Sequence, residues 1–220
     1  MKPQLLATTL QVAVADASHT ISEDEWDLAA EMVSWGPLAT EVRTLLAARI
    51  KSSWSSVSGI CSSTAEVRCA AALAASGHLT SVGWMRLRDL ELPSCGDIPA
   101  LARVVWGRVE LRNVTGDLGP LLANLRVTIG LNMFDVELDQ AATSSLVLCL
   151  QRGVAELVLG AGARVHLHTL LSYDGNGRCV WVRCWGDTAD TYREGMRVWA
   201  IQVNWGFEEL GIWGIQMYER

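Results

Sequence analysis

The sequence predicts an α/β fold in which strands and helices alternate along a solenoid, preceded by an N-terminal helical region. Half of the 220 residues are hydrophobic and only 19% are charged, which is typical of a chain that folds around a sizeable core. Two capping boxes, at 22–25 and 63–66, mark helix starts in the first third of the chain. From residue 87 onward, an L-x-x-L-x-L theme of apolar positions returns at intervals of 19 to 27 residues. The alternative is a compact α/β domain with a small parallel sheet, because such a domain also alternates strands and helices.

Residues 1–52 are predicted to form the helical region. An apolar stretch at 5–15 predicts a buried first helix or strand, and it resembles a secretory signal only weakly because polar residues interrupt it. Ser22 and Glu25 form the first capping box, and the sequence Trp35-Gly36-Pro37 ends this helix. Apolar residues share one helical face over 38–50, which predicts a second helix there.

Residues 53–220 are predicted to form an irregular repeat domain. It starts in a serine-rich stretch at 52–63, which predicts a short strand-like piece around Trp54. The second capping box, Ser63 with Glu66, then begins an alanine-rich helix that ends near the next glycine.

The repeated theme defines the strands of this domain. Its copies lie at 87–92, 106–111, 133–138 and 154–159, with a fifth around 180–182. Between copies, an aspartate that follows a glycine can cap a helix by accepting its free amides. These aspartates are Asp97, Asp117 and Asp187. The first two are 20 residues apart, close to the 19-residue step between the first two strands, so two independent features repeat together.

The repeated region resembles the leucine-rich-repeat family, in the irregular form found at the C-terminal end of NACHT-type animal innate-immune proteins. The resemblance covers about residues 55–205, and the copy from Leu87 to Cys95 meets the whole consensus. Val114, Ala141, Gly162 and Trp185 stand at the place of Cys95 in later copies. The resemblance implies a strand-and-helix solenoid that acts as a non-enzymatic, innate-immune module for protein recognition or autoinhibition.

Two further strands are predicted at the C-terminal end. Residues 198–203 fit the strand theme, and another apolar alternation at 212–217 follows too soon for a repeat with its own helix. The stretch at 204–211 has glycines at both bends and suits a hairpin loop, so the last strand is predicted to run antiparallel to its neighbour. Such a strand would cap the solenoid, whose open end would otherwise expose apolar core and unpaired amides.

Side chains alternate along a strand, so the charged residues of the theme are predicted to point outward. One outward column would contain Glu91, Glu110, Glu137, Val158 and Trp181, and its neighbour Asp89, Arg108, Asp135, Glu156 and Cys179. Stacked glutamates repel one another unless they are solvated or matched by a cationic partner. The sequence therefore predicts either a wet acidic face or a binding site for a basic protein. The predicted protein-binding residues are Asp89, Glu91, Arg108, Glu110, Arg112, Asp135, Glu137, Trp181 and Arg183.

Candidate catalytic and metal-ligating residues are few. His166 and His168 have a spacing that zinc can use, and with Asp174 they define the alternative function, a small cytosolic hydrolase or metal enzyme of α/β type. No third ligand is adjacent in the sequence, and the chain has neither a CxxC pair nor a phosphate-binding glycine motif. We therefore predict no enzymatic activity, no metal site and no cofactor.

Charge and cysteine usage limit the predicted partners and compartment. A formal net charge of -6 argues against nucleic acid and anionic membrane surfaces as partners, because both attract a basic face. Polar residues interrupt every 18-residue window, so no membrane span is predicted. The six cysteines are predicted to be reduced thiols of a cytoplasmic protein. Only Lys2 and Lys51 of the 18 basic residues are lysines, and this preference for arginine favours a recognition surface.

Overall fold

A computed structural model describes residues 3–16, 18–35, 38–55, 61, 63–92, 98–166, 169–170, 180–185, 198–203 and 216–218. This part of the chain is an α/β structure with one seven-stranded sheet. Four helices come first: α1 (Pro3–Ala15), α2 (Glu23–Trp35), α3 (Thr40–Ser55) and α4 (Thr64–Ala75). The strands are β1 (Ser81–Glu91), β2 (Val105–Thr115), β3 (Arg126–Phe134), β4 (Glu156–Leu159), β5 (Val180–Trp185), β6 (Val198–Val203) and β7 (Gln216–Tyr218). None of the described helices is both long and apolar enough to cross a membrane.

The first two helices begin where the sequence predicts them. The apolar stretch at 5–15 lies in α1, where Leu10 and Val14 are buried one turn apart. The capping box before α2 is formed in both directions: the Glu25 amide donates to Ser22 Oγ at 3.3 Å, and the Ser22 amide donates to Glu25 Oε2 at 2.7 Å. The residue pattern of a capping box therefore predicted the start of α2 correctly.

Helix α3 is longer than the sequence analysis predicts, and the strand-like piece predicted at 52–63 is wrong in its first part. Leu46, Ile50 and Trp54 follow one another at helical spacing, and all three side chains are fully buried. The helix therefore continues to the residue that completes its buried face. Later in that stretch, Cys61 forms an isolated parallel bridge with Leu87 at the edge of β1.

The second capping box is only half formed. Ser63 caps α4 by accepting a hydrogen bond from the Glu66 amide at 3.2 Å. The Glu66 carboxylate instead accepts from Trp54 Nε1 at 2.8 Å, inside the core between α3 and α4. Burial of the Trp54 ring leaves its N–H in need of an acceptor, which explains why Glu66 turns inward.

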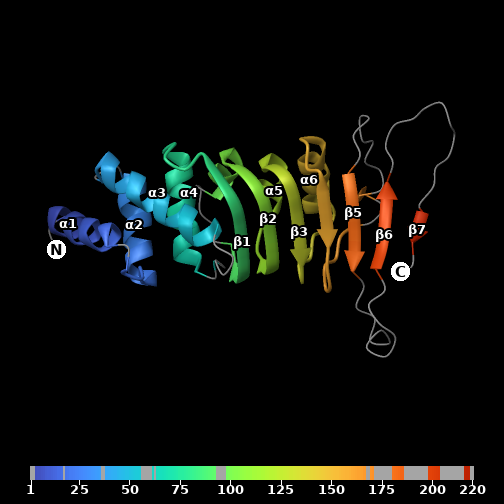
Figure 1. Ribbon diagram of the computed structural model, residues 1–220, viewed down its shortest axis with the longest axis horizontal. Coiled ribbons are helices and arrows are strands. Elements are labelled where there is room, and N and C mark those ends of the chain that lie inside the picture. The colour runs from blue at the N-terminus through green and yellow to red at the C-terminus, as the bar shows by residue number, and fades with distance from the viewer. Residues whose placement is uncertain are drawn as a thin grey trace.

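The strands of the sheet lie side by side in chain order, from β1 to β7 (Figure 1). β1 to β5 pair in parallel, which requires crossover connections. The crossovers contain η1 (Ile98–Arg103) after β1, α5 (Gly119–Asn124) after β2 and α6 (Gln140–Gln151) after β3. Helix α4 contacts η1, η1 contacts α5, and α5 contacts α6, so these helices form one continuous layer along the sheet.

The pairing of β1 with β2 differs from the predicted alignment of the repeats. Leu87 pairs with Leu111, and Leu111 pairs with Met133, whereas the predicted alignment puts Leu92 opposite Leu111. β1 begins at Ser81, six residues before the predicted copy, and an earlier apolar frame that contains Met85 and Leu87 supplies its inward side chains. The last positions of the four predicted copies, Leu92, Leu111, Leu138 and Leu159, would form one inward column if the copies were aligned. The register shows that they do not, although all four side chains are buried.

The C-terminal strands confirm one predicted direction and add a reversal. β7 pairs antiparallel with β6, as the sequence predicts. β6 forms at 198–203 as expected, but it pairs antiparallel with β5 and so ends the parallel part of the sheet. A reversed strand can follow its neighbour without a crossover helix. The capping role of the last strand remains a prediction.

Of the three predicted helix caps, the one at Asp117 is wrong and the other two are not tested. Leu118, and not Asp117, occupies the N-cap position of α5, and Asp117 accepts only from the Gly119 amide at 3.2 Å. Asp97 and Asp187 lie outside the described residues. The sequence analysis missed α6, although Asp139 stands at its N-cap, where the carboxylate accepts from the Ala142 amide at 2.7 Å.

These contacts predict that the two aspartates differ in their effect on stability. We expect Asp139→Ala to lower the free energy of unfolding by about 1 kcal/mol, because α6 loses the acceptor for a free amide. Asp117→Ala is expected to cost less than about 0.5 kcal/mol, since Asp117 does not cap a helix. Urea denaturation of both variants measures this difference. A larger loss for Asp117→Ala would contradict the assignment of the caps.

Candidate functional site

The strand register defines three rows of residues across the sheet, and in β1 to β4 their side chains point outward. Trp84, Arg108, Gly130, Glu156 and Trp181 form the first row. Arg86, Glu110, Asn132, Val158 and Arg183 form the second, and Arg88, Arg112 and Phe134 form the third. We call the residues of these rows in β1 to β4 the outward face. It carries four arginines and two glutamates, so its charge is net positive.

The predicted column of stacked glutamates is wrong. Glu110 pairs with Arg86 and Asn132, and not with Glu91 or Glu137. Glu91 is the last residue of β1 and Glu137 follows β3, where it forms a bridge with Arg164; both are exposed. The repulsion that suggested a basic partner therefore has no basis in the register, because no two glutamates are neighbours in a row.

The second predicted column is also replaced. Asp89 and Asp135 are exposed residues with φ near +50°, and Asn113 between them has the same left-handed backbone. Asparagine and aspartate tolerate this conformation better than most residues. Asn113 Nδ2 donates to Asp89 Oδ1 at 2.9 Å. These three residues follow the third row along their strands. Arg108, which was predicted to stand between Asp89 and Asp135, lies in the first row instead.

Charged and aromatic side chains contact one another on the outward face. Arg108 lies 3.6 Å from the Glu156 carboxylate. The guanidinium of Arg86 lies 3.4 Å from the centre of the Trp84 ring, and that of Arg112 lies 4.7 Å from the centre of the Phe134 ring. Such cation–π contacts hold a guanidinium at a fixed place on the surface.

Three polar atoms beneath this face are buried and have no hydrogen-bond partner among the described residues. They are Trp84 Nε1, Arg112 Nε and Asn132 Oδ1. Native proteins pair most buried polar groups, so unpaired ones require a reason. All three belong to residues of the outward face, so polar groups are left unpaired in this part of the described sheet.

Sequence reasoning missed Trp84, Arg86, Asn132 and Phe134 as surface residues. The five-residue shift between β1 and β2 removed the first two from the expected columns, and a similar shift removed Phe134. The excess of arginine over lysine was a sequence signal for Arg86 alone among these four. Of the predicted residues, Arg108, Glu110 and Arg112 lie on the outward face, and Trp181 and Arg183 continue its first two rows in β5.

The alternative function, an enzyme that uses His166 and His168, finds no catalytic or metal-binding partner for these residues in the described part of the chain. His166 is exposed, and its Nδ1 lies 2.7 Å from Thr169 Oγ1. His168 and Asp174 lie outside the described residues. Within the described ranges, no group of three or more histidine, cysteine, aspartate or glutamate residues is arranged to hold a metal ion.

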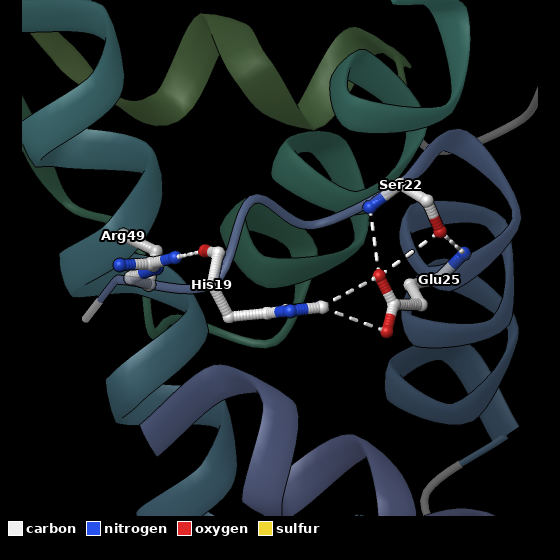
Figure 2. Close-up of polar contacts among 4 residues, drawn as sticks. All are labelled: His19, Ser22, Glu25 and Arg49. Atoms are coloured by element: carbon white, nitrogen blue, oxygen red, sulfur yellow. Dashed lines mark hydrogen bonds and ion pairs between the residues drawn. The ribbon is translucent and has the colours of Figure 1, made fainter. Parts of the chain in front are cut away.

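A serine, a histidine and a glutamate do meet between α1 and α2, as Figure 2 shows. Ser22 Oγ donates to Glu25 Oε2 at 2.9 Å, and His19 Nε2 lies 3.0 Å from the same carboxylate. In a catalytic triad the histidine contacts the serine, whereas here the carboxylate lies between them. The hydrogen bond from the Ser22 amide lowers the pKa of Glu25, which suits a helix cap. Arg49 donates to the His19 carbonyl and ties this turn to α3.

Three buried cysteines are poor nucleophiles. Cys61, Cys69 and Cys149 are free and buried. Burial raises the pKa of each thiol, that of Cys149 to about 12. The reactive thiolate form is therefore scarce near neutral pH.

Glu66 makes protein stability depend on pH. Burial raises the pKa of its carboxyl above the ordinary value of 4.5, so the folded protein binds this proton more tightly than the unfolded chain. Its contribution to stability is complete below pH 4.5 and is lost as the pH rises through the raised value, by about 1.4 kcal/mol per pKa unit.

Glu66→Gln isolates this effect, because the amide keeps an oxygen for Trp54 Nε1 and does not ionise. We expect the wild type to lose stability relative to the variant as the pH rises from 4 to 8, measured by urea denaturation at each pH. A stability difference between the two proteins that does not change with pH would contradict the raised pKa.

A hollow of about 700 Å³ lies at the start of α5 and α6, away from the rows of the outward face. Asp117, Glu137, Asp139 and Ser145 supply its polar lining. Asp139 is already used as a helix cap, and the lining contains no histidine or cysteine. The outward face is therefore the stronger candidate for a functional surface.

The chain was compared with protein-family models, with curated proteins and with solved structures. No family model matches it, and no match was found among the curated proteins or the solved structures.

Proposed function

We propose that this chain is a non-enzymatic recognition module that binds another protein through its outward face. The observation that carries the proposal is the set of half-buried arginine and aromatic side chains in register on β1 to β3. Arginine and tryptophan are enriched among the residues that dominate protein interfaces. Cation–π contacts already order Arg86 and Arg112, so less side-chain entropy is lost on binding.

We also propose that β1 to β5 with their helices form an irregular leucine-rich-repeat solenoid. Support comes from the chain order of the strands, their parallel pairing and the single layer of helices. Leu87, Leu111, Met133 and Leu159 occupy one level, which corresponds to steps of 24, 22 and 26 residues. These steps lie within or near the range of leucine-rich repeats. The innate-immune role and cytoplasmic location remain predictions.

A peptide-display selection on the purified full chain tests the recognition function. Selected peptides are then measured against a face variant, Trp84→Ala with Arg108→Gln, and a control variant, Trp35→Ala with Arg103→Gln. The control removes the same side-chain types at exposed positions away from the sheet. We expect the face variant to weaken binding about tenfold or more, which corresponds to about 1.4 kcal/mol, and the control less than twofold.

Three results would overturn the proposal: no enriched peptide, equal binding to the wild type and the face variant, or equal losses in both variants. Thermal melting shows whether the variants fold. If the face variant does not fold, hydrogen exchange of the wild type decides. Protection by the peptide confined to segments outside 84–88, 108–112 and 130–134 would then contradict binding at this face.

A further inference from the structure

The third outward row brings two arginines together. Arg88 and Arg112 pair directly across β1 and β2, whose backbones in a sheet are about 4.8 Å apart. Like charges at opposed positions destabilise a sheet. An anion between the two guanidinium groups would remove this repulsion.

The other arginines of the outward face already have partners. Arg108 is paired with Glu156, and Arg86 stacks on Trp84. In contrast, neither Arg88 nor Arg112 has a carboxylate within the ion-pair distance of 4.0 Å among the described residues. Arg112 Nε is buried without a hydrogen-bond partner in that part of the chain. The excess positive charge of the face is thus concentrated in this row.

A rigid support holds one of these arginines. Phe134 follows Arg112 in the row, and the guanidinium lies 4.7 Å from the ring centre. The Phe134 ring also lies close to Gly160, where a Cβ atom would come within 1.9 Å of the ring. Glycine at 160 therefore leaves room for the ring in the position where it contacts Arg112.

Acidic residues beside the row restrict the size of the anion. Asp89 and Asp135 are exposed and follow Arg88 and Phe134 in the chain, and the whole chain has a net charge of -6. A long polyanion such as a nucleic acid would meet these carboxylates, whereas a single carboxylate side chain can reach the arginines between them. Arginine pairs bind carboxylates with two parallel hydrogen bonds per guanidinium.

We propose that Arg88 and Arg112 bind the carboxylate side chains of an acidic segment in the partner protein. This inference rests on the proposed function and adds the chemistry of the partner to it. It replaces the basic partner suggested by the sequence, because the register groups arginines and separates the glutamates.

Fluorescence anisotropy with a labelled octaglutamate peptide tests the proposal, with octalysine and a Gly-Ser octapeptide as comparison probes. Arg88→Gln and Arg112→Gln are each expected to weaken octaglutamate binding about tenfold, because each removes a charged hydrogen-bond donor. The matched control is Arg103→Gln, an exposed arginine at the end of η1 with the same change of charge. It is expected to change binding less than twofold.

Charge reversal gives a second readout that does not depend on a loss of binding alone. Arg112→Glu should lose octaglutamate and gain octalysine, while Arg103→Glu should change neither by more than about twofold. The proposal is wrong if octaglutamate does not bind, if octalysine binds the wild type better, or if the Arg103 variants match the Arg88 and Arg112 variants. Tighter arginine-dependent binding of an eight-nucleotide oligo(dT) would also overturn it and indicate a nucleic acid.

Failure of this inference can be separated from failure of the proposed function. Display-selected peptides that depend on Trp84 and Arg108, but not on Arg88 and Arg112, would keep the recognition function and reject the acidic segment. Peptide binding that depends neither on Trp84 and Arg108 nor on Arg88 and Arg112 would show that the outward face is not the binding surface.

Discussion

Trp106→Ala is expected to lower the free energy of unfolding by about 3 to 5 kcal/mol, the largest effect of any change considered. The Trp106 side chain is fully buried, and its ring stacks on that of Trp54 with 5.8 Å between centres. Its Nε1 donates to the Leu101 carbonyl at 3.0 Å. The residue thus joins β2 to α3 and η1, and alanine would leave a cavity among all three. Urea denaturation followed by circular dichroism measures the loss.

Trp35→Ala is the matched control, since the Trp35 side chain is 85% exposed at the end of α2. The same substitution there should change stability by no more than about 0.5 kcal/mol. Similar losses in the two variants, or a loss below 1 kcal/mol for Trp106→Ala, would show that Trp106 does not join these elements.

Leu111→Ala is expected to cost about 2 to 5 kcal/mol. Leu111 lies on the inward side of β2, between Leu87 and Met133 in the neighbouring strands, and none of the three side chains is more than 1% exposed. Truncation would remove buried methyl groups and open a cavity between the sheet and its layer of helices. Chemical denaturation gives the free energy directly.

Leu148→Ala makes the same truncation at a position on α6 that is 45% exposed. Its expected cost is below about 1 kcal/mol, because much of the side chain stays in contact with water in the folded protein. If the two leucine variants lose equal stability, the inward row of β2 is not part of the core.

Local sequence patterns predicted the elements whose causes are local. The capping box at Ser22 and Glu25 predicted the start of α2, since both of its hydrogen bonds join residues three positions apart. Ser63 predicted the start of α4 for the same reason. The second half of that box failed, because the position of Glu66 is set by Trp54, twelve residues away. A contact at that distance along the chain cannot be recognised from capping residues alone.

The antiparallel direction of the last strand was also predictable. A short, glycine-bounded connection between two apolar alternations is typical of a hairpin, and β6 and β7 pair in that way. The reversal between β5 and β6 carried no comparable signal, because the alternation of a strand is the same in both directions.

The sequence by itself determined that the chain alternates strands and helices and that its apolar positions face a core. Only the tertiary structure decided which residues lie side by side on the outward face. β1 and the residue that follows it contain two apolar patterns, one with Met85 and Leu87 and one with Leu90 and Leu92, and all four side chains are buried. Pairing with β2 selects the first pattern, because parallel hydrogen bonding fixes the level of every residue at once. That choice separates the glutamates and brings Arg88 next to Arg112, and hence it supports the acidic partner that we propose in place of the basic one that the sequence suggested.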